Sequence, residues 1–213
     1  CTLALAATFD TECAREYGAV LGREANALDV NVVFGPGINL MRDPRCGRNF
    51  EYMGEDPFLA ARLAVAYISG VQALGVGACA KHYLANDAER LRHYTSANLD
   101  MDTAMNLHLL PFLAACREAD VWTIMTGNNL VNGRHISENR EWLEGILRER
   151  VGWDGVILTD WRAAYTPRET ALAGVDMATG FCEYVYGDGR LLGMVRDGEI
   201  PEEVLDEKAS RIL

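Results

Sequence analysis

The chain has 213 residues, of which 49% are hydrophobic and 24% charged, and this length and composition predict one large globular domain with a sizeable core. The formal net charge of −11 disfavours nucleic acid and anionic membranes as partners, because both attract basic surfaces, and it fits a neutral or cationic substrate. No apolar run approaches the roughly 18 residues of a transmembrane helix, so we expect no membrane span.

The six cysteines form no CxxC pair and do not cluster with the four histidines, which excludes the usual structural zinc patterns and predicts no metal site. Unpaired thiols slightly favour a reducing, cytoplasmic compartment, and the sequence leaves the localisation otherwise open. The first residues, CTLALAATFD, lack the basic segment of a signal peptide and resemble the middle of a domain. We therefore expect the domain to begin before this chain does.

Helical and strand patterns alternate through the first half of the chain. Asp10 or Thr11 can cap a first helix, while Asp56 followed by Pro57 predicts the start of a second, which Gly75 ends. In chain order we expect a helix over residues 11–28, a strand over 30–34, a long polar loop over 42–57, a helix over 57–74 and a strand over 76–80.

The same alternation continues to the end of the chain. The expected elements are a short strand over 97–99, a helix over 103–118, a strand over 121–125, a helix from 137 or 139 to 150, a strand in the GVILTD segment (155–160), a short helix over 168–172, a strand over 174–177, and helices over 189–196 and 202–212.

This alternation predicts an α/β fold with a parallel sheet, either a barrel or a doubly wound sheet. No GxGxxG and no P-loop follows a strand, so the doubly wound nucleotide folds lack their marker. We therefore predict a (β/α)8 TIM-type barrel. About six strands are recognisable, fewer than the eight of a full barrel, and we expect the barrel to be incomplete at the N-terminus.

Polar residues follow successive strands of this predicted barrel. They are Arg48 in the long loop, Lys81-His82, residues 126–129, Asp160-Trp161, and the residues after Asp176. The carboxyl ends of parallel strands meet at one rim, where functional groups gather in α/β folds. Hydrogen-bonding groups beside an indole suit a polyhydroxylated, neutral ligand such as a sugar.

Each residue also has an ordinary structural interpretation. Asp160 could cap a helix and Trp161 could fill core, while Arg48 and Glu51 could form a loop ion pair of little consequence. Lys81 could be solvated and His82 satisfied within the rim. Taken singly these interpretations are as good as the functional ones, and only the joint placement at strand ends favours a site.

Several motifs together resemble the N-terminal catalytic domain of glycoside hydrolase family 3, which includes many β-glucosidases and β-xylosidases. They occur in the family's order and cover most of residues 1–180, as GPGINLMRDPRCGRNFEYMGEDP, GVGACAKHYLANDAER, VNGRHISEN, GWDGVILTDW and AGVDMATG. The resemblance implies that Asp160 is the nucleophile of a retaining mechanism and forms a covalent glycosyl-aspartate intermediate. It implies no cofactor and assigns substrate binding to Arg48, Lys81, His82 and Trp161. Glu89 and Arg92 fall at positions that we interpret as secondary and supporting.

Neighbouring residues on a regular strand point to opposite faces, so Lys81 and His82 can reach one sugar only if the backbone departs from regular geometry there. Family members have non-proline cis peptides near this point. We therefore expect irregular backbone between Ala80 and Tyr83.

Three departures from the family pattern concern the site. The substrate-binding aspartate of the family's first strand would precede residues 2–5, outside this chain. The acid/base glutamate usually comes from a following α/β sandwich domain, and the nearby carboxylates Glu51, Glu55 and Glu89 match no acid/base motif. Gly127-Asn128-Asn129 stands where the family often has Ser-Tyr-Asn, so Asn128 replaces a tyrosine, and we interpret it as a further secondary residue of the site. The loop reads KHYLAND rather than KHFPGHG, which sets the N-acetylglucosaminidase branch aside.

We therefore predict that residues 1–213 are a single, truncated catalytic barrel domain of a retaining exo-acting β-glycosidase that hydrolyses terminal non-reducing β-D-glucosyl residues. The substrate would be a β-glucoside or a short β-linked oligosaccharide, with the acid/base carboxylate supplied by a C-terminal domain of the same protein. The alternatives are a β-xylosidase or other exo-β-glycosidase of the family, and a truncated domain that binds sugar without cleaving it.

Overall fold

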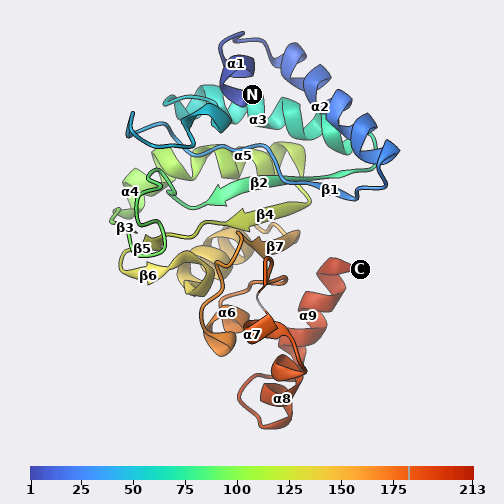
Figure 1. Cartoon of the computed structure of the whole chain (residues 1–213), viewed down its shortest axis with the longest axis vertical. Helices are drawn as coiled ribbons and strands as arrows, with labels where there is room; N and C mark the ends of the chain where they lie inside the picture. The colour runs from blue at the N-terminus through green and yellow to red at the C-terminus, as the bar shows by residue number, and fades with distance from the viewer. Residues whose placement is uncertain (182) are drawn as a thin grey trace.

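The computed structural model describes residues 1–181 and 183–213 and is built on a parallel β-sheet. Four strands hydrogen-bond in the order β1 (Val32–Val33), β2 (Gly77–Tyr83), β4 (Thr123–Thr126) and β7 (Val156–Thr159). This spatial order is also their order in the sequence, and helices connect them on one side of the sheet (Figure 1). Parallel strands added in sequence order under outer helices are the arrangement of a TIM-type barrel. The chain is therefore an incomplete TIM-type barrel, as predicted.

Two of the helices that cover the sheet, α2 (Thr11–Ala27) and α3 (Pro57–Gln72), begin where the sequence predicts. The other two, α5 (Leu110–Ala119) and the π-helical segment η4 (Glu141–Arg150), begin later than expected. The Asp10 carboxylate accepts the first backbone N–H groups of α2, and Asp56 accepts that of Leu59 in α3. Gly18 in α2 and Gly70 in α3 let the two helices pack backbone to backbone. A Cβ on Gly18 would lie 2.2 Å from the Tyr67 carbonyl oxygen, and a Cβ on Gly70 would lie 2.1 Å from that of Arg15. Local capping signals thus fix these helix starts.

Three expectations need correction. The helix expected over 103–118 is interrupted, because α4 (Met101–Thr103) continues into the π-helical segment η2 (Ala104–His108) before α5. Residues 126–133, expected as loop, contain β5 (Leu130–Val131), which pairs with β3 (Ser96–Ala97) and with β6 (Arg134–His135) in a second small sheet. The strand expected over 174–177 is absent: only Met177 bridges to β7, and the Asp176 carboxylate accepts the Ile157 backbone N–H where a longer ladder would form.

Short helices were also missed by the sequence patterns: α1 (Thr2–Ala6), α7 (Glu183–Tyr186), and the 3₁₀ turns η1 (Asn49–Glu51) and η3 (Ile136–Glu138). The remaining predicted helices are present as α6 (Pro167–Leu172), α8 (Arg190–Arg196) and α9 (Glu202–Ile212). None of the described helices has the length and apolar character needed to cross a membrane.

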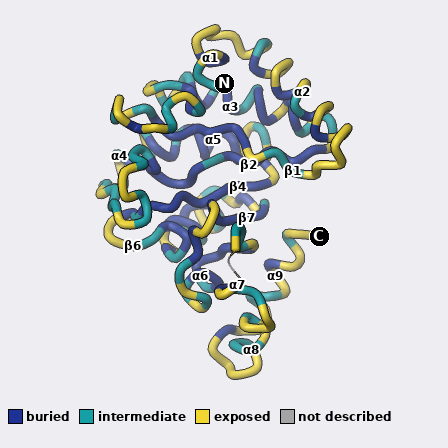
Figure 2. Tube along the Cα trace, viewed as in Figure 1, coloured by how far each residue is buried: buried dark blue, intermediate teal, exposed yellow. Residues whose placement is uncertain are grey.

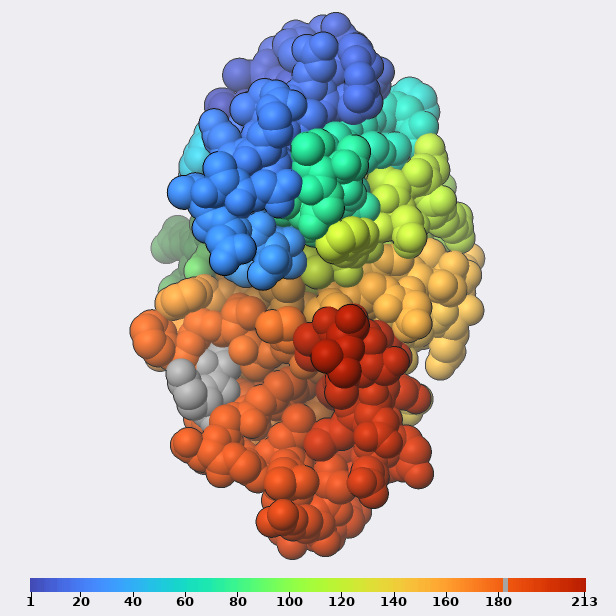
Figure 3. All heavy atoms as spheres, turned by 90° about the vertical axis from the view of Figure 1, so that its right-hand side faces the viewer, coloured from blue at the N-terminus to red at the C-terminus, as the bar shows by residue number. Residues whose placement is uncertain are grey.

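The apolar core lies between the sheet and the helices α2, α3, α5 and η4, and β4 and β7 are buried along their length (Figure 2). A smaller cluster of Cys79, Met125 and Leu158 lies on the sheet's other face. A cavity of about 950 Å³ is lined by strand residues such as Val32 and Val156 and by the end of α9. Figure 3 shows α9, in red, below the N-terminal segments on this side of the molecule. The predicted polar residues lie elsewhere, at the carboxyl ends of the strands.

Candidate active site

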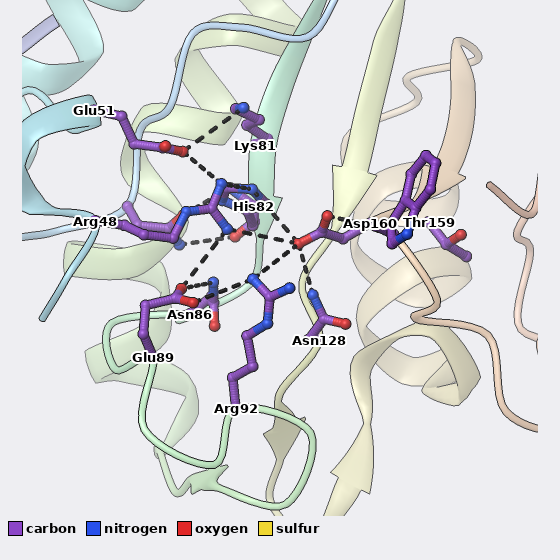
Figure 4. Close-up of polar contacts among 12 residues, drawn as sticks. Arg48, Glu51, Lys81, His82, Asn86, Glu89, Arg92, Asn128, Thr159 and Asp160 are labelled. Carbon is purple, nitrogen blue, oxygen red and sulfur yellow. Dashed lines mark hydrogen bonds and ion pairs between the residues drawn. The ribbon is translucent and has the colours of Figure 1, made fainter. Parts of the chain in front are cut away.

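Four strands deliver polar groups to one place (Figure 4). The loop after β1 (residues 34–56, the Arg48 loop) contributes Arg48, and β2 itself contributes Lys81 and His82. The loop after β2 (residues 84–95, the Glu89 loop) contributes Glu89 and Arg92. Asn128 follows β4 and Asp160 follows β7. The structure therefore brings together the residues that the sequence placed on separate strand ends.

Both oxygens of the Asp160 carboxylate are fixed by hydrogen bonds. Oδ1 accepts the backbone N–H of Trp161 at 2.6 Å, and Oδ2 accepts the Asn128 side-chain amide at 2.7 Å. The backbone N–H of Asp160 donates to the Thr126 carbonyl oxygen at 3.1 Å, which ties the residue to β4. The side chain is only 12% exposed. A carboxylate held at both oxygens has one orientation.

Cationic and imidazole nitrogens surround Oδ2 of Asp160. Arg48 Nη1 and His82 Nε2 lie 3.7 Å away, and Arg92 Nη1 lies 3.9 Å away. These distances are longer than hydrogen bonds, so the groups face the carboxylate without closing on it. Oδ2 therefore faces two guanidinium groups and the His82 ring.

His82 is buried, 1% exposed, and a reciprocal pair of hydrogen bonds holds its main chain. Its N–H donates to Asn39 Oδ1 at 2.6 Å, and its carbonyl oxygen accepts Asn39 Nδ2 at 2.8 Å. Arg48 Nη2 lies 2.8 Å from His82 Nε2, and because a guanidinium only donates, this nitrogen is an acceptor. Burial, together with Arg48 and other nearby cations, holds the pKa of His82 well below its usual range, so the ring is neutral.

The irregular backbone expected around Lys81 and His82 is present. Lys81 pairs with Met125 on β4, but Tyr83 pairs with the very next residue, Thr126, so His82 is an extra residue in the β2 ladder. The Lys81–His82 and Tyr83–Leu84 peptide bonds are cis. A residue inserted into a ladder breaks the strict alternation of side chains. Lys81 and His82 therefore both belong to the site (Figure 4).

Two glutamates complete the charge balance, and each lies between cations. Glu51 accepts a hydrogen bond from Arg48 Nη2 at 2.6 Å and lies 3.7 Å from Lys81 Nζ. Glu89 Oε2 lies 3.1 Å from Arg92 Nη1, and its Oε1 lies 3.7 Å from Arg48 Nη1. The Arg48–Glu51 pair, considered from the sequence as a loop ion pair, does exist, but it is about four-fifths buried and lies within the site.

Trp161 is a surface residue. Its side chain is 55% exposed and meets Phe181 edge to face at 5.4 Å between ring centroids. The ring also lies against Gly180, where a Cβ would come within 2.4 Å of the indole. The alternative that Trp161 fills core is therefore wrong. An exposed indole next to Asp160 is a free apolar surface at the edge of the site.

Sequence reasoning missed the supporting residues. Asn39 is buried in the GPGINL motif and was not singled out, although a buried asparagine in an apolar run is itself a signal that its amide has a specific partner. Asn86 donates to Glu89 Oε1 at 3.1 Å, and Tyr165 donates to the Asn128 carbonyl oxygen at 2.8 Å. Among residues 1–181 and 183–213, no group of three or more His, Cys, Asp or Glu side chains could hold a metal ion.

The comparison with known families decides the relationship. The model of the "Glycosyl hydrolase family 3 N terminal domain" matches residues 1–213. The chain belongs to glycosyl hydrolase family 3.

Relatives of this family 3 chain are named β-glucosidases. It is 40% identical to beta-glucosidase BoGH3A of Bacteroides ovatus over 221 residues, covering 98% of the chain and 30% of that protein. It is 37% identical to thermostable beta-glucosidase B of Acetivibrio thermocellus, covering 98% of the chain and 28% of that protein. The chain thus spans about 30% of the length of these curated relatives.

Solved structures give the same relationship for the fold. Beta-glucosidase 3B from Thermotoga neapolitana in complex with glucose superposes with a TM-score of 0.92 at 34% identity, over 97% of the family 3 chain and 30% of its own. The beta-glucosidase from Kluyveromyces marxianus in complex with glucose gives a TM-score of 0.95 at 30% identity, over 99% and 25% of the two chains.

Proposed function

We propose that this chain is the nucleophile-bearing domain of a retaining exo-β-glucosidase, with Asp160 as the nucleophile. The observation that carries the proposal is the setting of the Asp160 carboxylate: held at both oxygens, and facing Arg48, His82 and Arg92 through Oδ2. A retaining glycosidase needs a fixed, ionised carboxylate beneath the anomeric carbon. The names of the relatives and the two glucose complexes support glucose as the glycone.

In the proposed first step, Asp160 Oδ2 attacks the anomeric carbon while the bond to the aglycone oxygen breaks. A carboxylic acid gives the departing oxygen its proton, and a glycosyl ester of Asp160 forms. In the second step the acid, now itself a carboxylate, takes a proton from water. The water oxygen attacks the anomeric carbon, the ester bond to Asp160 breaks, and Asp160 is again a free carboxylate. Two inversions give net retention.

The remaining residues are proposed to position the sugar. Arg48 and Lys81 offer charged donors to glycone hydroxyls, and the neutral His82 ring can both donate and accept. Trp161 would line the pocket with its apolar face, as aromatic side chains do against sugar rings. Glu89 and Arg92 would support this set from the Glu89 loop.

The acid/base carboxyl is proposed to come from a C-terminal domain of the same protein, with residues 1–213 forming the single barrel domain. A general acid must be free to present its carboxyl group to the departing oxygen. Glu51 and Glu89 are each engaged in ion pairs with two cations, and Glu55 is exposed. Within the described residues these three glutamates therefore make poor candidates.

The test is turnover of aryl β-glucoside and aryl β-xyloside by the longest natural protein that contains this chain, beside its Asp160→Asn variant. Asparagine keeps the shape but cannot attack as a carboxylate, so we expect a loss of about 10³-fold or more on the glucoside. Asp154→Asn is the control, because that carboxylate is 83% exposed and pairs with Arg211 away from the site. Unchanged turnover by Asp160→Asn would refute the nucleophile, and preferred turnover of the xyloside would refute the glycone.

A further inference from the structure

A second polar cluster joins the same two loops behind the site. Arg42 Nη1 lies 3.2 Å from His108 Nε2, and His108 Nδ1 lies 3.3 Å from Asp87 Oδ2. Arg42 belongs to the Arg48 loop, Asp87 to the Glu89 loop, and His108 is the last residue of η2. His108 is buried, 4% exposed, so the ring is enclosed between its two partners.

The contact with Arg42 determines which nitrogen of the His108 ring carries the proton. A guanidinium carries only donors, so His108 Nε2 must accept, and the neutral ring then has its one proton on Nδ1. Nδ1 faces Asp87 Oδ2 at 3.3 Å. Burial, with Arg42 adding to it, lowers the pKa of His108 to about 4, which agrees with a neutral ring at physiological pH. Arg42 thus donates to Nε2 of His108, and the protonated Nδ1 of the same ring faces Asp87.

The Arg42–His108–Asp87 cluster links two loops that carry residues of the site. Asp87 stands between Asn86 and Glu89, and Asn86 donates to Glu89. The two loops also meet at the site itself, where Arg48 Nη1 is 3.7 Å from Glu89 Oε1. A single 3.7 Å contact between two long side chains does not fix the relative position of two loops by itself. The His108 cluster is a second connection between them, and the His108 ring is buried.

We propose that His108 is a positioning residue that ties the Arg48 loop to the Glu89 loop and so sets the distance between Arg48 and the Glu89–Arg92 pair beside Asp160. Its effect on turnover rests on the proposed function, while its effect on the loops does not. Neither His108 nor Asp87 touches Asp160 in the contacts of the described residues. Their substitution should therefore act through the loops.

The test compares amide hydrogen exchange and kcat/KM in the longest natural protein that contains this chain. His108→Phe keeps an aromatic ring and removes both nitrogens, and with them the contacts to Arg42 and Asp87. Asp87→Leu removes the acceptor, and Asp87→Asn keeps an acceptor oxygen of the same shape. Leu113→Ala, in the core on α5, serves as the control for general destabilisation.

His108→Phe and Asp87→Leu should each speed exchange in residues 34–56 and 84–95 by about tenfold or more, with α2 unchanged. They should also lower kcat/KM on aryl β-glucoside by about 10- to 100-fold, the range expected for a lost hydrogen bond to a charged group. Asp87→Asn should leave kcat/KM unchanged and keep both loops at least as protected from exchange as in the unmodified protein. Leu113→Ala should raise exchange without selecting the two loops.

Faster exchange spread evenly over the chain in His108→Phe, as in Leu113→Ala, would overturn the proposal, and so would loss of both properties in Asp87→Asn. Faster exchange in the two loops with unchanged kcat/KM would overturn the positioning role, and it would not bear on Asp160 as the nucleophile. Because exchange needs no turnover, a wrong nucleophile would not hide the result. If His108→Phe does not fold, the Asp87 pair carries the test.

Discussion

Asn39 offers the sharpest test of how the site is built, because one side chain holds two main-chain groups of His82. Replacing Asn39 by alanine leaves the His82 N–H and carbonyl oxygen without the partners that now lie at 2.6 and 2.8 Å. Asn39 is 3% exposed and His82 1%, so water does not readily replace the lost amide. A buried polar group left without its partner costs about 1–3 kcal/mol.

Two such groups give an expected loss of about 2–6 kcal/mol in the free energy of unfolding, a large share of the roughly 5–15 kcal/mol typical of a domain. His82 and its neighbour Lys81 should also lose their fixed positions. A displacement of about 1 Å in a positioned group can cost about 100-fold in rate, and we expect a fall of that order in kcat/KM.

The assay is urea unfolding and kcat/KM on aryl β-glucoside, measured for Asn39→Ala and for the control Asn26→Ala. Asn26 also donates from its amide to a backbone carbonyl, that of Leu74 at 2.8 Å, but it lies on the surface. The control should change stability by less than about 1 kcal/mol. Equal, small losses in both variants would refute the reasoning, as would a destabilised Asn39→Ala protein with unchanged kcat/KM.

Three other substitutions test single contacts. Arg48→Met removes a cation that faces three carboxylates and should lower kcat/KM by about 100-fold or more. Arg45→Met on the same loop, whose side chain is 88% exposed, should have little effect. Asn128→Ala frees one oxygen of Asp160 and should lower kcat by about 10- to 100-fold with KM little changed; a change in KM alone would contradict it. Burial raises the pKa of Asp87 to about 7, so its contribution to stability is present below about pH 4 and is lost as pH rises through 7. Between these pH values the free energy of unfolding of Asp87→Asn should rise relative to that of the unmodified protein by at most about 4 kcal/mol. Urea unfolding at both pH values measures this difference, and a difference that does not grow with pH would contradict the prediction.

Local signals in the sequence predicted much of the fold. Asp10 and Asp56-Pro57 mark true helix starts because the cap and its N–H groups lie within three residues of each other. The expectation failed where tertiary contacts compete with local pattern. The apolar run at 174–177 reads as a strand, but Asp176 uses its side chain to occupy the backbone N–H of Ile157, and only a single bridge remains.

The sequence also predicted one part of the candidate site and not the other. The sequence located the groups at strand ends, since barrel topology alone brings Asp160, Lys81 and Arg48 to one rim. It did not locate their partners, because these pairings span long stretches of chain: Asn39 with His82, and Arg48 with Glu89. The sequence predicts Asn128 as a secondary residue that replaces a tyrosine. Its amide on Asp160 could not be inferred from sequence, as it depends on how β4 and β7 lie side by side.

The most direct test of the central claim is covalent labelling with a 2-deoxy-2-fluoro-β-glucoside that carries an activated aryl leaving group. The fluorine slows both steps by destabilising the oxocarbenium-like transition state, while the good leaving group lets the first step proceed, so the glycosyl-enzyme accumulates. Digestion and mass spectrometry of the labelled, longest natural protein should place the sugar on Asp160. An adduct on any other carboxylate, or active enzyme that turns over glucosides and is never labelled, would contradict the account.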